Sequence, residues 1–452
     1  MRIRLGIPIT AEKIANAVHG RLAELAPTIC FSYLSTDTRE LCRGDLFIPL
    51  RGEKFDGEDF LDEVKTKGAI PLTTKEFYGS IRVQDIDGLL LILARYCKSL
   101  LKNLKHTVAI TGSVGKTTTK ELTKSLLEHH FKIHATMGNF NNKIGLPLTV
   151  LSAPKDTEIL ILEMGMNHEG EISELSKCVN PTVAVITNIG SAHIGNLGSR
   201  ENIAKAKLEI TDGMYGGRLI LPYGEPLLPI TKNAVTFSSK TTESDVYIIY
   251  NEGNCVAFDG YDNIRADVRS VAPYLMECLA AAVAVCRELG VKLSTSKCAF
   301  SSIFDKNIRQ NIFFVNKIVI LADYYNASLE SVSAALDYLC DLKEYEYKSA
   351  LLGDVLELGD RAKDIHRAIG EKCGRLGLRS LYLFGGYSHF VADGALSAGM
   401  SEDRIHINTD LNAPNITADQ IYRNSSESEI ILFKASHAID LGRVLSHLKE
   451  YQ

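Results

Sequence analysis

The residues whose types and spacing most clearly predict chemistry form a short run that ends in lysine and threonine. The run is Thr111-Gly-Ser-Val-Gly-Lys-Thr117. Its glycines let the backbone N–H groups of a loop converge on an anion, and the N-terminus of a following helix adds positive charge. Lys116 can then reach the β- and γ-phosphates of a nucleoside triphosphate, and the Thr117 hydroxyl can bind Mg²⁺. We therefore predict an ATP site formed by Thr111, Gly112, Ser113, Val114, Gly115, Lys116, Thr117 and Thr118.

The flanking residues favour this interpretation over a chance Gly-Lys-Thr in a surface turn. The longer pattern G-x-x-x-x-G-K-[ST] would need glycine at position 110, where this chain has isoleucine. However, residues 107–110 favour a strand, and Leu122, Leu126 and Leu127 lie on one side of the amphipathic run that follows. The order strand, tight loop, helix is the context that a phosphate loop requires.

Further polar residues follow the strands that we expect between residues 105 and 310. These strands lie near 107–110, 159–163, 183–187, 218–221 and 234–237. Continuous apolar runs such as Ile159-Leu-Ile-Leu162 are typical of a parallel sheet covered on both faces. Sites in such sheets gather at the carboxyl ends of the strands. The candidates there are Glu163, Asn188 with His193, and Lys207 with Glu209 on the next helix.

Each candidate also has a structural explanation. Glu163 suits Mg²⁺, which prefers hard oxygen ligands, but an acidic residue can also begin a helix. His193 could bind a metal or cap a loop, and its local sequence favours the cap. Lys207 lies on a polar helix face, where a lysine is normally solvated.

Two polar segments have the composition of ligand-binding loops. Gly138-Asn-Phe-Asn-Asn-Lys-Ile-Gly-Leu-Pro147 contains Asn139, Asn141 and Asn142, whose amides can bind sugar hydroxyls or phosphate oxygens. A plain turn explains the same residues equally well. Near the N-terminus, Asp37 and Arg39 lie in a polar run where the guanidinium could bind a phosphate or carboxylate in a bidentate manner. A solvated turn is the simpler explanation there.

Composition limits the class of protein. The chain of 452 residues is too long to fold around a single hydrophobic core, so two or three domains are expected. A net charge of −5 without a Lys/Arg block argues against a nucleic-acid partner. The ten cysteines contain no C-x-x-C pair, which favours buried thiols in a reducing cytosol over disulfides or zinc. The sequence has no signal-peptide core and no apolar run long enough to cross a bilayer, so a cytoplasmic protein without a membrane partner is expected.

The remaining parts of the chain are expected to form two smaller α/β regions. We expect residues 1–84 to form a small domain with a helix that starts near Thr10. An amphipathic helix near 86–103 is expected to follow this domain. Residues 311–452 alternate again, with strands near 317–322, 349–352, 380–384 and 429–433. Gly385-Gly386 resembles a Rossmann-type turn but lacks G-x-G-x-x-G, so it is a weak dinucleotide signal.

Taken together, these segments resemble the Mur ligases, and within that family the D-alanyl-D-alanine-adding type. Along essentially the whole chain, seven segments resemble family motifs and occur in the family's order. They are Ser35-Thr-Asp-Thr-Arg39, Thr111–Thr117, Gly138–Pro147, Glu163-Met-Gly-Met-Asn-His-Glu-Gly-Glu-Ile172, Asn188–His193, Ala204–Lys207, and Gly353-Asp-Val-Leu-Glu-Leu-Gly359 with His366.

The resemblance implies an α/β protein with three-domain Mur ligase architecture. Residues 1–84 would bind the UDP-sugar, and residues 85–310 would form the central parallel-sheet ATPase domain with the phosphate loop. Residues 311–452 would form a Rossmann-like domain that closes over ATP and binds the amine. The implied protein is a monomer.

The resemblance also implies a reaction and its residues. ATP, with Mg²⁺, would phosphorylate the terminal carboxylate of a UDP-linked muramoyl peptide, and the amine of D-alanyl-D-alanine would attack the acyl phosphate. Lys116, Glu163, His193 and Lys207 would be catalytic, with a carbamylated Lys207. Thr117, Glu163, His193 and Lys207 would bind metal. Asp37, Arg39, Asn139, Asn141 and Asn142 would bind the UDP-sugar, and Arg309, Asp323, Tyr325 and Asn326 would reach the nucleotide.

Several positions depart from the family pattern. Ile308 replaces the glycine before Arg309, and Val271–Glu277 lacks the polar groups usual for adenosine binding. Asp323–Leu329 and Lys434-Ala-Ser-His437 are also altered. Alternatives therefore remain: a relative that joins a different amine to a related UDP-linked acid, an ATP-binding regulatory protein, or an inactive scaffold.

Overall fold

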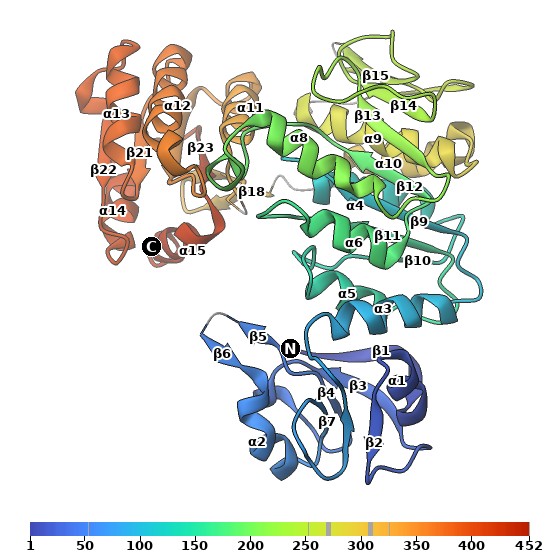
Figure 1. Ribbon diagram of the computed structural model, residues 1–452. Coiled ribbons are helices and arrows are strands. Elements are labelled where there is room, and N and C mark those ends of the chain that lie inside the picture. The colour runs from blue at the N-terminus through green and yellow to red at the C-terminus, as the bar shows by residue number, and fades with distance from the viewer. Residues whose placement is uncertain (53, 252, 268–272, 306–310, 325, 452) are drawn as a thin grey trace. The chain divides into compact units, whose positions relative to one another are not determined.

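The computed structural model describes residues 1–452 except 53, 252, 268–272, 306–310, 325 and 452 (Figure 1). The described chain falls into two compact units. The first contains residues 1–111, 127–185 and 206–219, and the second contains residues 112–126, 186–205 and 220–452. Three main sheets carry the fold.

The N-terminal sheet has six strands in the order β1-β3-β4-β7-β8-β2. Its outer pairs, β1–β3 and β2–β8, are antiparallel, and the pairs between β3 and β8 are parallel. The strands are β1 (Arg2–Thr10), β2 (Arg21–Ala23), β3 (Cys30–Ser35), β4 (Leu46–Phe47), β7 (Ile70–Thr73) and β8 (Ser80–Arg82). A two-stranded sheet, β5 (Arg51–Gly52) and β6 (Phe55–Asp56), accompanies it.

The predicted helices of this region are confirmed. Helix α1 (Ala11–Ala17) begins directly after Thr10, whose hydroxyl accepts a hydrogen bond from the Lys13 N–H at 3.4 Å. This contact satisfies one of the free N–H groups at the helix start. The short helix α2 (Leu61–Thr66) lies further along, and the amphipathic helix after the sheet is α3 (Leu89–Leu100), with Leu89, Leu90, Leu93 and Ala94 buried.

The nine-stranded sheet has the order β10-β11-β9-β12-β13-β14-β15-β16-β17. All five strands predicted for this region are present, and the pairs β10–β11, β11–β9 and β14–β15 are parallel. Every residue of β11 and β12 is buried, as expected of strands covered on both faces. The strands so far are β9 (His106–Thr111), β10 (Ile133–Ala135), β11 (Ile159–Glu163), β12 (Val183–Ile186), β13 (Arg218–Pro222) and β14 (Ala234–Ser238).

At one edge, the central sheet continues beyond the parallel strands that the sequence predicts. Strands β15 (Val246–Asn251), β16 (Asn254–Phe258) and β17 (Asn263–Asp267) pair in antiparallel fashion. In β16, buried and less buried residues alternate. Such half-buried strands lack the continuous apolar runs that identified the others.

The helices of this region connect the strands of the nine-stranded sheet. Helix α4 carries the lysine and threonine of the phosphate loop in its first turn. The helices are α4 (Lys116–Leu127), α5 (Gly145–Leu151), α6 (Glu171–Val179), α7 (Ile194–Leu197), α8 (Arg200–Leu208), α9 (Pro273–Glu288) and α10 (Lys297–Asp305).

The C-terminal sheet has six strands in the order β18-β19-β23-β20-β21-β22. Five of them are parallel, and only β18 pairs in antiparallel fashion, at the edge. The Rossmann-like prediction is therefore confirmed in its parallel core. The strands are β18 (Asn311–Val315), β19 (Ile318–Ala322), β20 (Tyr347–Gly353), β21 (Leu381–Phe384), β22 (Ile405–Asn408) and β23 (Glu429–Lys434).

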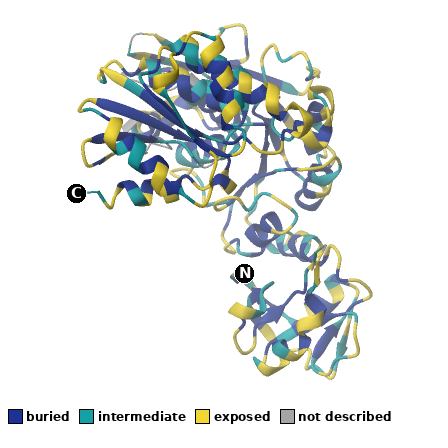
Figure 2. Cartoon of the chain, turned by 90° about the vertical axis from the view of Figure 1, so that its left-hand side faces the viewer, coloured by how far each residue is buried: buried dark blue, intermediate teal, exposed yellow. Residues whose placement is uncertain are grey.

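Helices cover this C-terminal sheet. Helices α14 and α15 contribute Ala418, Ile421, Val444 and Leu448 to one buried cluster with the strands. Figure 2 shows buried strands in dark blue and exposed helix surfaces in yellow. The helices are α11 (Leu329–Asp341), α12 (Ala362–Leu376), α13 (Ser388–Ser397), α14 (Pro414–Asn424) and α15 (Gly442–Leu448). Among the described residues, no helix has both the length and the apolar character to span a membrane.

Candidate active site

The phosphate loop connects β9 to α4 and depends on two glycines. Gly112 has φ of 150° and Gly115 has φ of 82°, both in the region that favours glycine. A Cβ atom on Gly112 would lie 1.8 Å from the Thr187 hydroxyl oxygen, so no side chain fits there. The sequence prediction of a strand, tight loop and helix at these residues is confirmed.

Lys116 lies over the loop that it follows. Its Nζ donates hydrogen bonds to the carbonyl oxygens of Gly112 at 2.7 Å and Ser113 at 3.3 Å. The ammonium group is thus held beside the backbone of the glycine-containing turn. A phosphate bound in this turn would meet both the lysine and the positive end of α4.

The apex of the loop is fixed by residues that follow β12. The Val114 N–H donates to Asn188 Oδ1 at 3.1 Å, and Asn188 Nδ2 donates to the Val114 carbonyl at 2.9 Å. The Thr187 hydroxyl donates to the same carbonyl at 2.6 Å. In addition, the Gly190 N–H donates to Ser113 Oγ at 2.8 Å. Sequence reasoning placed Asn188 at a strand end but did not find this supporting role.

Glu163 ends β11 and lies opposite Ile110 of β9, which precedes the phosphate loop by one residue. Its side chain is buried, its backbone N–H donates to Thr136 Oγ1, and Asn141 Nδ2 donates to its Oε1 at 2.9 Å. The alternative of a helix-start acid is wrong because Glu163 is a strand residue. Asn141 therefore orients the carboxylate that we expect to bind Mg²⁺.

The three asparagines of the 138–147 loop have different surroundings. Asn142 Oδ1 accepts hydrogen bonds from the N–H groups of Ile144 and Gly145, at the start of α5. Asn139 is exposed, and its carbonyl accepts from the Asn141 N–H. Of the three, Asn141 is the one whose amide contacts Glu163.

Lys207 is buried, although its local sequence favours a solvated lysine. It lies in α8 and has a relative exposure of 2%. Burial of an amine requires compensating polar groups, because an isolated buried charge is strongly unfavourable. Nearby Glu209 has a structural role, since its carboxylate accepts from the N–H groups of Gly170 and Ser173 at the start of α6.

His193 lies at the N-terminal cap of α7 with φ of 65°, a left-handed conformation that is uncommon for residues other than glycine. Its Nδ1 is 2.6 Å from Oε2 of Glu357. The contact with His193 lowers the pKa of the Glu357 carboxyl, and burial partly opposes this effect. No local sequence pattern indicates this pair.

In the C-terminal region, Lys434 fixes the segment that contains two predicted nucleotide residues. Its buried Nζ donates to the carbonyls of Asp323 and Asn326 and lies 3.0 Å from Asp323 Oδ2. Asn326 Oδ1 accepts from the Ala327 N–H. Arg309 and Tyr325 lie outside the described residues.

The Gly385-Gly386 turn is occupied by a side chain of the protein itself. The carboxylate of Asp354 accepts hydrogen bonds from the N–H groups of Gly386 at 2.8 Å and Tyr387 at 3.0 Å. These N–H groups are therefore already satisfied, which argues against a dinucleotide phosphate there.

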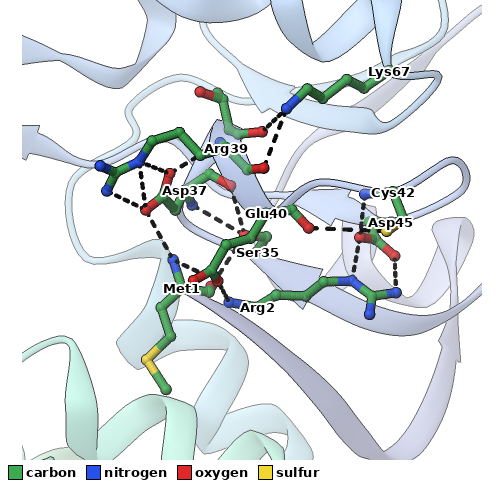
Figure 3. A network of polar contacts seen from close by, with 10 residues as sticks. Met1, Arg2, Ser35, Asp37, Arg39, Glu40, Cys42, Asp45 and Lys67 are labelled. Carbon is green, nitrogen blue, oxygen red and sulfur yellow. Dashed lines mark hydrogen bonds and ion pairs between the residues drawn. The ribbon is translucent and has the colours of Figure 1, made fainter.

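The predicted substrate residues Asp37 and Arg39, in the short helical turn after β3, form an ion pair (Figure 3). Arg39 Nη2 lies 2.6 Å from Asp37 Oδ2, and the Arg39 guanidinium holds the pKa of the Asp37 carboxyl well below its usual range. Asp37 also accepts from the Arg39 N–H, so it stabilises the turn. Arg39 is exposed and can meet a ligand.

A surface cavity of about 580 Å³ is lined by none of the predicted site residues. Tyr347, Arg379 and His406 contribute to its lining, and they stand near the amino-terminal ends of β20, β21 and β22. Ligands of parallel sheets bind at the opposite, carboxyl ends.

The donor set of the candidate site fits ATP with Mg²⁺. Thr117 and Glu163 offer a hydroxyl and a carboxylate, and Mg²⁺ is usually bound by one or two carboxylates together with substrate phosphates. Within the described ranges, no three His, Cys, Asp or Glu side chains form a metal-binding group.

Comparisons with known proteins identify the family. Residues 110–286 match the Mur ligase middle domain. A UDP-N-acetylmuramoyl-tripeptide–D-alanyl-D-alanine ligase of Bacillus subtilis is 34% identical over 98% of both chains. The chain belongs to the Mur ligase family.

Solved structures of Mur ligases match the fold over nearly the whole chain. A MurF crystal structure from Acinetobacter baumannii has a TM-score of 0.87 at 27% identity and covers 99% of this chain and 100% of its own. A MurF ligase from Thermotoga maritima in complex with ADP has a TM-score of 0.79 at 29% identity and covers 92% and 97%. The α/β architecture is therefore that of the MurF-type Mur ligases.

Proposed function

We propose that this Mur ligase uses ATP to join D-alanyl-D-alanine to a UDP-N-acetylmuramoyl-tripeptide, a step in the synthesis of peptidoglycan precursors. The observation that carries the proposal is the match, along 98% of both chains, to a ligase of that name. The phosphate loop and the buried carboxylate at the neighbouring strand end support it.

The reaction proceeds in two steps. A carboxylate oxygen of the peptide attacks the γ-phosphorus of ATP, which forms an acyl phosphate and releases ADP. The dipeptide amine then attacks the acyl carbon, loses a proton and displaces inorganic phosphate, which leaves the new amide bond. Lys116 and the loop N–H groups stabilise the negative charge of the transferring phosphoryl group.

Thr117 and Glu163 would hold Mg²⁺, and Asn141 keeps the Glu163 carboxylate in position. The cation neutralises charge on the phosphates when it is bound. We further propose His193 and Lys207 as residues of a second metal position, with a carbamylated Lys207. The burial of Lys207 supports a role other than solvation.

Other residues have proposed substrate contacts. Asp37, Arg39, Asn139, Asn141 and Asn142 would bind the UDP-sugar, and Asp323 and Asn326 would reach the nucleotide. Arg309 and Tyr325 are proposed there from the family motif alone. The proposal also includes three domains, residues 1–84, 85–310 and 311–452, and each main sheet lies within one of these ranges. It further includes a monomeric state and a cytoplasmic location.

The test is a phosphate-release assay with the purified full-length protein, Mg-ATP, UDP-muramoyl tripeptides that carry lysine or diaminopimelate, and a panel of D-amino-acid dipeptides. We expect release only when tripeptide and D-alanyl-D-alanine are both present, and loss of release in Lys116→Met. If phosphate is released only when the tripeptide is combined with a different amine, that amine is the acceptor. Release without either substrate would contradict a ligase.

A further inference from the structure

Two segments of the second unit meet along residues 190–195. Glu330 of α11 accepts hydrogen bonds from the Ser191 N–H at 2.7 Å and from its hydroxyl at 3.1 Å. The Gly195 N–H donates to the carbonyl of Glu357 at 3.1 Å. Residues 190–195 are thus held at both ends by the C-terminal region, with His193 between the two contacts.

Three residues at this contact have positive φ angles, which are uncommon for residues other than glycine. His193 has φ of 65° and Glu357 has φ of 64°, both left-handed, and neither residue is glycine. Gly359 has φ of 54°, and a Cβ there would lie 2.9 Å from the Cα of Gly195. Such conformations persist where the surroundings impose them, and they cluster at functional sites.

The side chains of His193 and Glu357 form a close contact. Nδ1 of His193 lies 2.6 Å from Oε2 of Glu357, and the imidazole side chain is 21% exposed. When a neutral imidazole carries its proton on Nδ1, the nitrogen nearest this carboxylate, its lone pair is on Nε2. Metal-binding histidines commonly use one ring nitrogen for the metal and donate the other N–H to a carboxylate.

We propose that Glu357 is a positioning residue that holds His193 with Nε2 free to bind a divalent cation. The histidine is then correctly oriented only while residues 353–359 lie against residues 190–195. The inference rests on the metal-binding role of His193 in the proposed function, and it assigns a task to the glutamate of the Gly353–Gly359 segment.

The experiment measures Mn²⁺ binding to the full-length protein by electron paramagnetic resonance. The protein is compared with His193→Ala, Glu357→Ala, Glu357→Gln and the matched control Glu427→Ala, which removes an exposed carboxylate of the same region. Electron spin-echo modulation reports an imidazole nitrogen bound to Mn²⁺. Circular dichroism confirms that each variant is folded.

We expect a nitrogen signal in the unaltered protein and in Glu427→Ala, and none in His193→Ala. Loss of a carboxylate that supports a metal ligand typically weakens metal binding 10- to 100-fold. Glu357→Ala should therefore weaken Mn²⁺ binding at the nitrogen-coupled site by about that factor and reduce the nitrogen signal, and Glu357→Gln should lie between. If Glu357→Ala does not fold, Glu357→Gln alone decides.

Two results would overturn the inference: no nitrogen signal that depends on His193, or unchanged Mn²⁺ affinity and signal in both Glu357 variants. These readouts are separate from phosphate release. The predicted Mn²⁺ results without ligase activity would leave the positioning role intact and contradict the proposed function. Ligase activity with unchanged Mn²⁺ binding in the Glu357 variants would contradict the positioning role alone.

Discussion

Asn188→Ala should loosen the phosphate loop without altering any residue that contacts phosphate in the proposed mechanism. The Asn188 side chain makes two hydrogen bonds to Val114, one to its N–H at 3.1 Å and one to its carbonyl at 2.9 Å. Alanine removes both bonds. The Thr187 hydroxyl would still donate to the same carbonyl.

The expected magnitude follows from these two bonds. A neutral hydrogen bond contributes about 1 kcal/mol net, so the local free energy that holds the loop closed should fall by about 2 kcal/mol. Because 1.4 kcal/mol corresponds to a factor of ten, the loop should open up to about 30-fold more often. ATP affinity should fall by as much as the same factor where binding requires the ordered loop.

The assay is hydrogen exchange of peptides that contain residues 112–118, combined with equilibrium binding of ATP. Local exchange is preferable to global unfolding because large multidomain chains do not unfold in two states. Asn408→Ala is the matched control, since Asn408 Nδ2 also donates two hydrogen bonds, to the Ala413 carbonyl and to Thr417 Oγ1. Exchange and ATP affinity both unchanged in Asn188→Ala would refute the reasoning.

Three further changes test other parts of the structure. Gly112→Ala should abolish nucleotide binding in equilibrium dialysis, whereas Gly216→Ala, where a Cβ meets nothing within 4 Å, should not. Lys434→Met should destabilise the C-terminal region by about 3 kcal/mol, because the buried ammonium donates to two backbone carbonyls and pairs with the half-buried Asp323 carboxylate. The more exposed pair of Lys372 with Asp337 should contribute less than about 1 kcal/mol, as tested in Lys372→Met. Hydrogen exchange of peptides from the C-terminal region is the measurement for both variants. Burial lowers the pKa of His366, whose Nε2 accepts from the Val355 N–H, so the unfolded chain takes up a proton first as pH falls. Stability should therefore decrease below pH of about 6.5, and thermal unfolding of His366→Asn should show a smaller decrease; equal slopes would contradict this.

Much of the fold could be predicted because its strongest signals are local. The run from 159 to 162 is apolar at every position and forms the fully buried β11. The glycines and lysine of the phosphate loop are close in sequence, and their backbone requirements act within a few residues. Glu163 could be placed at a site because the end of a parallel strand determines the edge of the sheet.

The remaining features depend on partners far away in the chain. Lys207 occupies a helix with a polar pattern, and nothing in that pattern shows that its side chain is buried. His193 and Glu357 are separated by more than a hundred residues, and so are Lys434 and Asp323. Local spacing cannot identify such pairs, because tertiary packing decides which polar group faces which.

One segment, residues 187–195, connects the two parts of the site that sequence reasoning treated separately. Its first residues support the phosphate loop through Asn188 and Gly190. Its later residues carry His193 and contact Glu330 and Glu357 of the C-terminal region. A displacement of the C-terminal region would therefore move His193 directly. It would also reach the phosphate loop, because only a few residues of the same segment separate His193 from Gly190 and Asn188. This continuity gives a physical reason why nucleotide and metal binding should respond together to changes at Glu330 or Glu357.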